Sequence, residues 1–298
     1  MSVHIPVLMN EVLEGLDIQP DDIIIDGTIN GGGHACAIAK ELGSDGILVG
    51  IDQDSHGLDV SRERLTSVAP QVHLVHDNTR NLDAILDRLH IEHYDKLLLD
   101  LGWSSNQFED PTRGFSFKHD GPLVMTLSDD PKQAAFTAHE IVNDWSEESL
   151  VDILIGYGEE RFARRIGKAI VEARAVSPIE RTLQLAEIIK EAVPKRFQNG
   201  PLHPATQSFQ AIRIAVNDEM GALREILEKG FDRLSPGGRM VIISFHSIED
   251  RIVKHYFRTK KLSGEGIILT KKPIIADDDE LEVNRRARSA KLRILKKI

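Results

Sequence analysis

Short apolar runs alternate with amphipathic segments through the first third of the chain. Apolar runs rich in Val, Ile and Leu predict buried strands, and apolar residues that recur every three to four positions predict helices. The runs predict strands at residues 22–26, 47–51, 72–76 and 96–101. Helical periodicity lies between them, at residues 33–42, 56–68 and 79–90. This alternation is typical of a parallel sheet with right-handed crossover helices.

The alternation stops in the middle of the chain. Residues 131–200 carry no strand pattern but several helical patterns, such as Glu159–Val171. A long helix is predicted from about Phe209 to Leu234, then a turn at Ser235–Gly238 and a strand at Met240–Phe245. We therefore expect an α/β fold, a Rossmann-like doubly wound sheet interrupted by a helical domain. The expected segments are 1–108, a mostly helical insertion at 109–207, and 208–298, which completes the sheet and carries a basic C-terminal segment.

One more helix and two short strands are predicted after this point. The helix runs from Ile248 towards Arg258, with Ser247 as its N-cap and Asp250 placed like the N3 acid of a capping box. The acidic residues 277–280 indicate an exposed loop. The strands are expected at residues 266–270 and 291–296.

Polar or glycine-rich residues follow four of the predicted strands. Ligands of doubly wound sheets bind beyond the carboxyl ends of the strands, so these four segments should converge on one cleft. The agreement of four segments is stronger than any single motif, and we take this edge of the sheet as the candidate site. The segments are Asp26–His34, Asp52–Asp54, Asp100–Gln107 and Ser244–Ser247.

The glycine cluster at 31–33 is the most informative of these segments. A strand, a glycine cluster and a helix in succession make a turn that cradles a nucleotide, because glycine lets a ligand approach the backbone and a helix N-terminus offers free N–H groups. Asp52 follows Gly33 by 19 residues, the spacing of an acid that holds ribose hydroxyls. The dinucleotide pattern G-x-G-x-x-G fails, because its third glycine position holds Cys36. Asp26 favours S-adenosylmethionine, which carries an ammonium group and no pyrophosphate. A nicotinamide cofactor is the alternative.

The composition predicts a cytoplasmic protein. Of 298 residues, 41% are apolar, which is enough for a large core. A single cysteine excludes an internal disulfide, and no apolar run approaches the roughly 20 residues that a membrane span needs. The first residues lack the basic and apolar regions of a signal peptide. No His or Cys cluster has metal-ligand spacing, so no metal is expected.

Charge is unevenly spread along the chain. Residues 251–298 hold 14 Lys and Arg against 6 Asp and Glu, a net charge of +8, whereas residues 1–250 hold 23 against 41, a net charge of −18. Such asymmetry predicts a phosphate-binding face, although charge alone fits a solvated surface equally well. The candidate RNA contacts are Arg285, Arg286 and Arg288 in the tail and, by helical spacing, Arg161, Arg164, Arg165 and Lys168.

Several long and unusual strings are spread over nearly the whole sequence. They are His4–Leu8, Asp26–Thr28, Gly31–His34, Leu98–Gly102 with Ser104, Ser105 and Gln107, Arg113–Phe117, Asp120–Leu123, Tyr157–Arg161, His203–Thr206, Phe209–Ala211 and Ser244–Ser247. Together they resemble the bacterial RsmH (MraW) family, which methylates N4 of a cytidine in 16S ribosomal RNA with S-adenosylmethionine. The resemblance implies a Rossmann-like methyltransferase domain interrupted by a helical domain. It also implies 16S rRNA as partner, within the small ribosomal subunit, and leaves the oligomeric state open, a homodimer included.

The resemblance also assigns residues to the site. Positions that contact the cofactor correspond to Gly32, Gly33, His34, Asp52, Thr79, Asp100 and Gln107. Thr79 stands where the family often has Phe, which weakens a role in stacking on the adenine. Val124 and Thr126 stand where the family usually has Asp and Arg. These departures keep a second function open, a non-catalytic ribosome- or RNA-binding paralogue on the same fold.

Asp100 and Trp103 are the candidate catalytic residues. Methylating an exocyclic amine requires the amine to be held in line with the methyl group, with an acceptor for its N–H as charge develops. Asp100 can be that acceptor, or it can contact the cofactor. Trp103 is spaced to stack on an extruded cytosine, or else it packs at the domain junction. His34 and His246 are candidate general bases, although a lone histidine more often serves structure.

Overall fold

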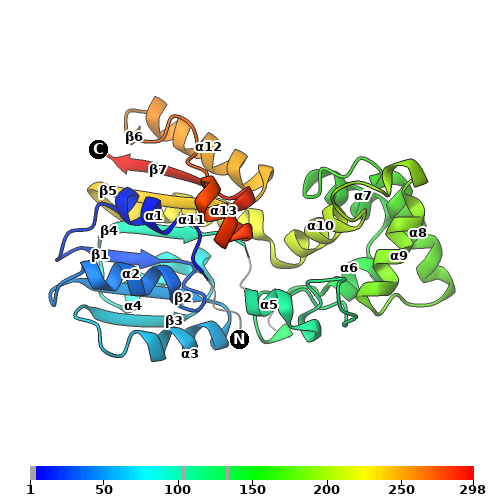
Figure 1. Ribbon diagram of the computed structural model, residues 1–298, viewed down its shortest axis with the longest axis horizontal. Helices are drawn as coiled ribbons and strands as arrows, with labels where there is room; N and C mark the ends of the chain where they lie inside the picture. Colours follow the sequence, from blue (N-terminus) through cyan, green and yellow to red (C-terminus); the bar gives the residue numbers. More distant parts are fainter. Residues whose placement is uncertain (1–4, 103–104, 132–133) are drawn as a thin grey trace. The chain divides into compact units, whose positions relative to one another are not determined.

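The chain folds into two compact units. The computed structural model describes residues 5–102, 105–131 and 134–298. The sheet unit comprises Met1–Gly102 and Met220–Ile298, and the helical unit comprises Trp103–Glu219 (Figure 1). The helical unit is therefore inserted into the chain of the sheet unit. The observed junctions differ from the predicted boundaries after residues 108 and 207.

A seven-stranded sheet forms the centre of the sheet unit, in the order β3-β2-β1-β4-β5-β7-β6. β1 to β5 are parallel, and β7 runs antiparallel to both β5 and β6. The predicted strands are all confirmed, and the turn predicted at Ser235–Gly238 lies within β5, where its pairing with β4 shifts register. The strands are β1 (Ile23–Asp26), β2 (Ile47–Asp52), β3 (Gln71–His76), β4 (Tyr94–Asp100), β5 (Leu234–Ser244), β6 (Gly266–Ile268) and β7 (Lys291–Lys297).

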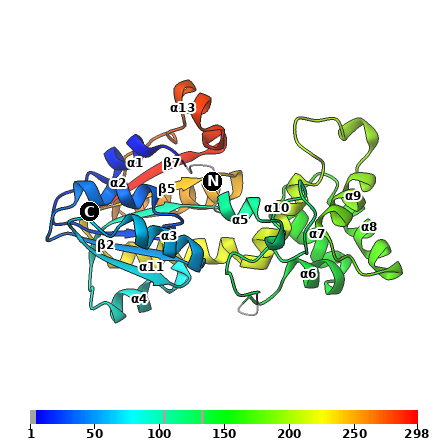
Figure 2. The ribbon, with the colours of Figure 1, turned by 60° about the horizontal axis from the view of Figure 1, so that its bottom comes forward.

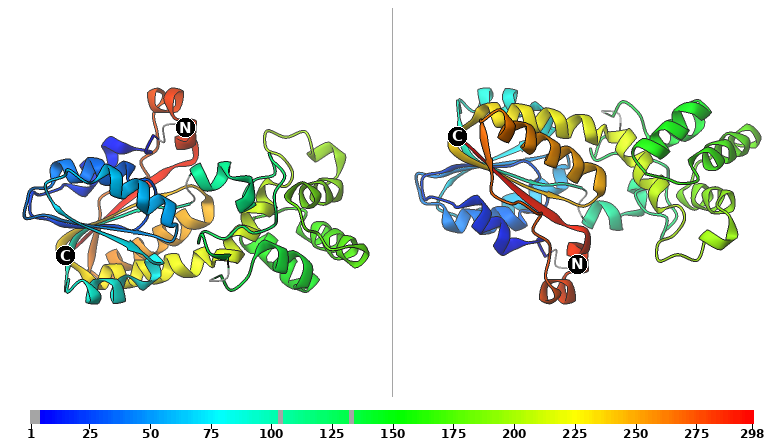
Figure 3. Two further views of the ribbon diagram at one scale, coloured as in Figure 1. Left: turned by 90° about the horizontal axis from the view of Figure 1, so that it is seen from below. Right: turned by 90° about the horizontal axis from the view of Figure 1, so that it is seen from above.

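Helices cover both faces of this sheet (Figure 3). Because side chains of a strand point alternately to opposite faces, Ile24 and Leu98 enter one core and their neighbours Ile25 and Leu99 enter the other. Burying such a side chain contributes about 1.5–3 kcal/mol, so the two layers hold the sheet between them. The first core is shared with α1 (Met9–Leu16), α2 (Gly33–Glu41) and α3 (Ser55–Arg64). The second is shared with α4 (Leu82–Arg88), α11 (Glu219–Arg233) and α12 (Ser247–Leu262).

The helical unit, whose helices Figure 2 shows, has a core of its own side chains. Its centre is a cluster of fully buried isoleucines, among them Ile141, Ile166 and Ile212. In the described part of residues 131–200 the chain forms helices and turns but no strand, as predicted. The helices are α5 (Ser105–Glu109), α6 (Ala138–Asp144), α7 (Glu147–Gly156), α8 (Ala163–Val176), α9 (Thr182–Ala192) and α10 (Thr206–Asn217).

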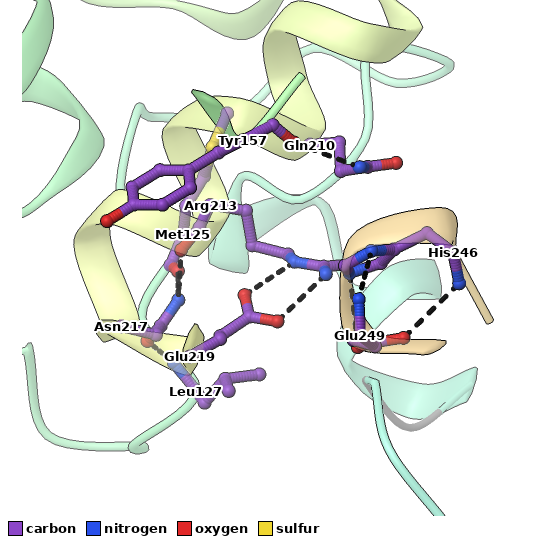
Figure 4. Close-up of polar contacts among 9 residues, drawn as sticks. All are labelled: Met125, Leu127, Tyr157, Gln210, Arg213, Asn217, Glu219, His246 and Glu249. Carbon is purple, nitrogen blue, oxygen red and sulfur yellow. Dashed lines mark hydrogen bonds and ion pairs between the residues drawn. The ribbon is translucent and has the colours of Figure 1, made fainter. Parts of the chain in front are cut away.

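The single helix predicted from Phe209 to Leu234 is in fact two helices. α10 ends at Asn217 because Asp218 adopts the left-handed conformation, with φ of 45°, and α11 begins at the next residue. The Asn217 side chain fixes this end: its Oδ1 accepts from the Leu127 N–H at 2.7 Å, and its Nδ2 donates to the Met125 carbonyl at 2.8 Å (Figure 4). The break therefore depends on contacts with a loop that is distant in sequence, which helical periodicity does not reveal.

The acidic segment 277–280 forms a helix rather than the predicted loop. α13 spans Asp278–Val283, and the carboxylate of Asp277 caps it by accepting from the Glu280 N–H at 2.9 Å. Acidic side chains in the first turn of a helix are stabilising because they oppose the positive end of its dipole. The cluster of acids that indicated an exposed loop is therefore equally a helix start signal.

Candidate functional site

The carboxyl ends of three strands bring three aspartates to one edge of the sheet. Asp26, Asp52 and Asp100 are the last residues of β1, β2 and β4. The Asp100 N–H donates to Thr28 Oγ1 at 2.6 Å, and the Asn30 N–H donates to Asp52 Oδ2 at 2.8 Å, so the loop after β1 joins both neighbouring strand ends. The strand order reverses between β1 and β4, and such a switch point is where doubly wound sheets bind ligands.

The glycine loop needs its glycines for packing within the sheet unit. Gly32 has a φ of 73°, a conformation that favours glycine, and a Cβ on it would lie 3.1 Å from Ser61 Oγ. A Cβ on Gly33 would lie 2.5 Å from Pro6 Cγ. The sequence suggested that a Cβ in this loop would obstruct a ligand. The structure adds a second reason for glycine, because a Cβ would also collide with Ser61 or Pro6. The N-terminus of α2 that follows has no side-chain cap.

His34 is buried and connects the N-terminal segment with Asp100. Its Nε2 lies 2.9 Å from the Val7 carbonyl, and its Nδ1 lies 3.7 Å from Asp100 Oδ2. Burial lowers the pKa of His34, which favours the neutral ring. A neutral ring that donates from Nε2 to the Val7 carbonyl keeps a lone pair on Nδ1, facing the Asp100 carboxyl group.

Asp100 is buried with one oxygen unsatisfied. Its side chain is 11% exposed, and Oδ1 has no hydrogen-bond partner among the residues that the structure describes. Burial raises the pKa of Asp100 to about 7, and the charge of Glu249 acts in the same direction. Buried polar atoms without partners are rare and costly, on the order of 1–3 kcal/mol, so an acceptor left open at a strand end points to a ligand that donates to it.

The other two aspartates share this environment. Burial raises the pKa of Asp26 to about 7, opposed by His34 and by a hydrogen bond from the Thr28 N–H at 3.1 Å. Burial also raises the pKa of Asp52 to about 6, although its two oxygens accept from the N–H groups of Asn30 and Asp54. Three desolvated carboxyl groups without a Lys or Arg ion pair among the described residues suit a positively charged ligand and disfavour a pyrophosphate.

The turn between β5 and α12 contributes a pair of residues that sequence reasoning placed wrongly. His246, rather than Ser247, is the N-cap of α12, and the acid of the capping box is Glu249 rather than Asp250. Glu249 is buried, accepts from the His246 N–H at 3.2 Å and lies 3.1 Å from His246 Nε2 (Figure 4). The prediction missed this pair because the Glu249 N–H donates to an imidazole nitrogen of His246, whereas an N-cap acceptor is usually a Ser or Thr oxygen.

The remaining predicted site residues are distributed between the two units. The Thr79 hydroxyl donates to the Gly27 carbonyl at 2.7 Å, at the end of β1. Gln107 belongs to the helical unit, where it is buried and its Nε2 donates to the Leu127 carbonyl at 3.1 Å. Trp103 lies outside the described residues, so its stacking role stays a prediction. Thr126 is fully buried, with its Oγ1 donating to the Ser128 carbonyl at 3.0 Å.

The predicted RNA-binding residues are all exposed, on two separate elements. Several other basic residues of the C-terminal segment are engaged within the sheet unit. Arg293 forms a two-pronged ion pair with Asp250, at 2.7 and 3.1 Å, and Lys297 donates to the Phe231 carbonyl at 2.8 Å. The exposed residues are Arg161, Arg164, Arg165 and Lys168 at α8, and Arg285, Arg286 and Arg288 on the 3₁₀ helix η5 (Arg285–Ser289).

Within the described residues, no helix combines the length and the apolar character that crossing a bilayer requires. The sheet order differs from the dinucleotide order 3-2-1-4-5-6 by the reversed strand β7, inserted between β5 and β6. That order, with a glycine loop after β1 and acids closing β2 and β4, defines a Rossmann-like methyltransferase fold. The chain belongs to the MraW methylase family, whose model matches residues 1–298.

Curated relatives agree with this assignment over the full length. The ribosomal RNA small subunit methyltransferase H of Clostridioides difficile (strain 630) is 40% identical over 312 residues, covering 99% of each chain. The proteins of the same name from Heliobacterium modesticaldum and Brevibacillus brevis are each 42% identical, over 99% of this chain and 98% of theirs. Among solved structures, an rRNA methylase from Streptococcus thermophilus is 12% identical over 97% of this chain and 93% of that one, with a TM-score of 0.43, so the family assignment rests on the sequences.

Proposed function

We propose that this protein transfers the methyl group of S-adenosylmethionine to the exocyclic N4 of a cytidine in 16S rRNA. The reaction and the RNA are those that the resemblance implies, and relatives named ribosomal RNA small subunit methyltransferase H, 40% and 42% identical, match 99% of this chain. The observation in the structure that supports catalysis most directly is the buried Asp100 with its unsatisfied Oδ1.

The carboxyl groups of the site fit this cofactor. S-adenosylmethionine supplies an electrophilic methyl group on a sulfonium and carries a net positive charge. The carboxyl groups of Asp26, Asp52 and Asp100 lie at one sheet edge, Asp26 and Asp100 buried and Asp52 half-buried, and a cation would stabilise their charged forms. We assign cofactor binding to these acids, to Gly32 and Gly33 with the uncapped start of α2, and to His34 and Thr79. Gln107 remains a proposed contact from the helical unit.

Asp100 has the chemistry to assist the amine. Its open Oδ1 accepts a hydrogen bond from an N–H, and an amine that is being methylated develops positive charge on that N–H. The backbone N–H of Asp100 is held by Thr28 Oγ1, and His34 Nδ1 lies 3.7 Å from Oδ2, so the carboxyl group stands at a fixed strand end before substrate arrives. Such preorganised acceptors act without a reorganisation cost during the reaction. Trp103 stays proposed as the residue that stacks on the flipped base.

The proposed substrate places the protein in the cytoplasm, acting on rRNA within the small ribosomal subunit. The test is a transfer assay with labelled S-adenosylmethionine and small subunits that lack the modification, in parallel with a naked 16S rRNA transcript. We expect label in one cytidine, at N4. A protein that binds the cofactor and the subunit but transfers no label would instead support the non-catalytic paralogue.

A further inference from the structure

We propose that an arginine-rich surface of the helical unit holds the phosphate backbone of the RNA substrate. We call it the α8–η4 face. It combines the residues at the start of α8 with the 3₁₀ helix η4 (Lys195–Phe197), which no sequence pattern had singled out. The inference rests on the proposed function for the identity of the RNA and adds where the RNA is held. The face comprises Arg161, Arg164, Arg165, Lys195 and Arg196, with Phe197 between them.

Phe197 gathers two of these charges on a single ring. The guanidinium carbons of Arg161 and Arg196 each lie 4.8 Å from the centroid of the Phe197 ring. The Phe162 ring lies 5.2 Å from Phe197, and Arg161 lies 5.5 Å from Phe162 as well. Stacking on an aromatic ring holds a guanidinium in place while leaving its edge N–H groups free for phosphate oxygens. The fold therefore fixes two arginines that are far apart in sequence beside each other.

The charges of this face have no acidic partner within residues 5–102, 105–131 and 134–298. Among the described residues, none of the five cations forms an ion pair, whereas their neighbour Lys168 is paired with Glu172 at 3.6 Å. Glu160, the acid that directly precedes Arg161, is buried and accepts from the Phe162 N–H at 2.8 Å instead. All five cations are exposed.

The α8–η4 face lies at a helix N-terminus, where unpaired positive charge is unfavourable. Arg164 and Arg165 lie in the first turn of α8, which contains no acidic residue and has no side-chain cap. Cations at this end oppose the helix dipole and destabilise the helix, whereas an anion bound there would stabilise it. A cluster of cations kept at an unfavourable place is best explained by a polyanion that binds them.

The C-terminal arginines are a weaker candidate for the same role. Arg285, Arg286 and Arg288 directly follow α13, and residues 277–282 hold five acids. Arg286 already has a partner within the protein. Acidic neighbours repel phosphate and reduce the number of counterions that RNA binding releases. Both elements carry exposed arginines, so a matched comparison between them decides the question.

The test compares two triple variants of the full-length protein that remove the same charge. One is R164Q/R165Q/R196Q on the α8–η4 face, and the other is R285Q/R286Q/R288Q on η5. Binding to unmodified small subunits and to a naked 16S rRNA transcript is measured across a salt series, with cofactor affinity and methyl transfer measured on the same preparations. We expect the first triple to bind roughly 10- to 100-fold more weakly near 0.1 M salt and to flatten the log–log salt slope by about 2–3, since each phosphate contact contributes about 0.7–0.9.

A third variant tests the role of the ring without changing charge. F197L keeps an apolar side chain but removes the face on which the guanidinium groups stack. We expect RNA binding to weaken by about 2- to 5-fold, the value of exposed cation–π contacts, with the salt slope unchanged.

The proposal is overturned if the η5 triple loses as much RNA affinity as the α8–η4 triple, or if the α8–η4 triple keeps the wild-type slope. Loss of binding to subunits with unchanged binding to the naked transcript would point to a ribosomal protein as the partner of this face, and would also overturn it. A failure of the proposed function is distinguished by the methyl-transfer assay, because the wild-type protein would then transfer no methyl group.

Discussion

Among single residues, Asp100 is the one whose surroundings bear most directly on the proposed reaction. It ends β4 as a buried carboxyl group with Oδ2 facing His34 and Oδ1 unsatisfied. The structure stabilises its neutral form, since burial raises the pKa of Asp100 to about 7. Such a group costs stability in the free protein, and a bound donor or cation removes that cost.

Replacing Asp100 by Asn keeps the shape of the side chain and removes its charge. We predict that kcat falls by about 10²-fold or more, as for other preorganised electrostatic groups, while the melting temperature is unchanged or higher. Steady-state kinetics with subunits as substrate check this. A variant with wild-type kcat and only a raised KM for the cofactor would show that Asp100 binds the cofactor alone.

The buried acids also predict a pH dependence of stability. Asp26 and Asp100 have folded-state pKa values raised to about 7, so their contribution is fully present below the ordinary carboxyl pKa and is lost as the pH rises through about 7. The pKa of His34 is lowered by burial, so the contribution of His34 to stability increases as the pH rises.

The comparison is therefore between the wild type and D26N or D100N in thermal melts from pH 5 to pH 8. The variants should lose less stability over that range, and cofactor affinity of the wild type should increase with pH as the acids ionise. Parallel pH profiles for the wild type and both variants would contradict the assignment.

At the scale of elements, a strap of residues 5–8 ties the C-terminal helix α13 to the glycine loop. Glu280 Oε1 accepts from the Leu8 N–H at 2.8 Å, and Asn284 Nδ2 donates to the Ile5 carbonyl at 3.1 Å. The carbonyl of Val7, between these anchors, is the partner of His34. α13 therefore positions the histidine that faces Asp100 although the two elements are distant in sequence.

The strap predicts an effect of Glu280 on the cofactor. E280A should weaken cofactor binding by roughly 3- to 10-fold, because an unpaired Leu8 N–H destabilises the strap by about 1 kcal/mol, whereas E280Q keeps an acceptor and should rescue binding. D278N, in the same helix, is the matched control for the change in charge. Calorimetry gives the affinities. A lower melting temperature in E280A with unaltered cofactor affinity would reduce Glu280 to a purely structural residue.

The same elements show which parts of the fold a sequence can predict. The parallel strands and the convergence of their ends follow from local apolar runs, and the structure confirms them. The break at Asp218 was mispredicted because it depends on contacts of Asn217 with a loop that is distant in sequence. The cap at His246 and the helix α13 were mispredicted because their capping signals, although local, were assigned to the wrong residues or to a loop. The unsatisfied oxygen of Asp100 is likewise a property of packing, and only the structure reveals it.

At the scale of the whole molecule, the chain combines two units with separate cores. The helical unit buries its own cluster of apolar residues. The end of α10 is held within the same unit, because Asn217 Nδ2 donates to the Met125 carbonyl. We predict that residues 103–219, expressed alone, fold cooperatively, because a domain with its own core does not need its neighbour to fold. A cooperative thermal transition by circular dichroism is the expected result. A gradual melt with exposed apolar surface would show that the two units fold only together.

The activity assigned to the whole molecule is methylation of a 16S rRNA cytidine at N4. Mass spectrometry of small-subunit rRNA from cells with the gene, without it, and without it but supplied with D100N tests this claim most directly. We expect one cytidine that carries an N4-methyl group only where the wild-type protein is present, and strongly reduced methylation with D100N. Identical methylation of the rRNA with and without the gene would contradict it.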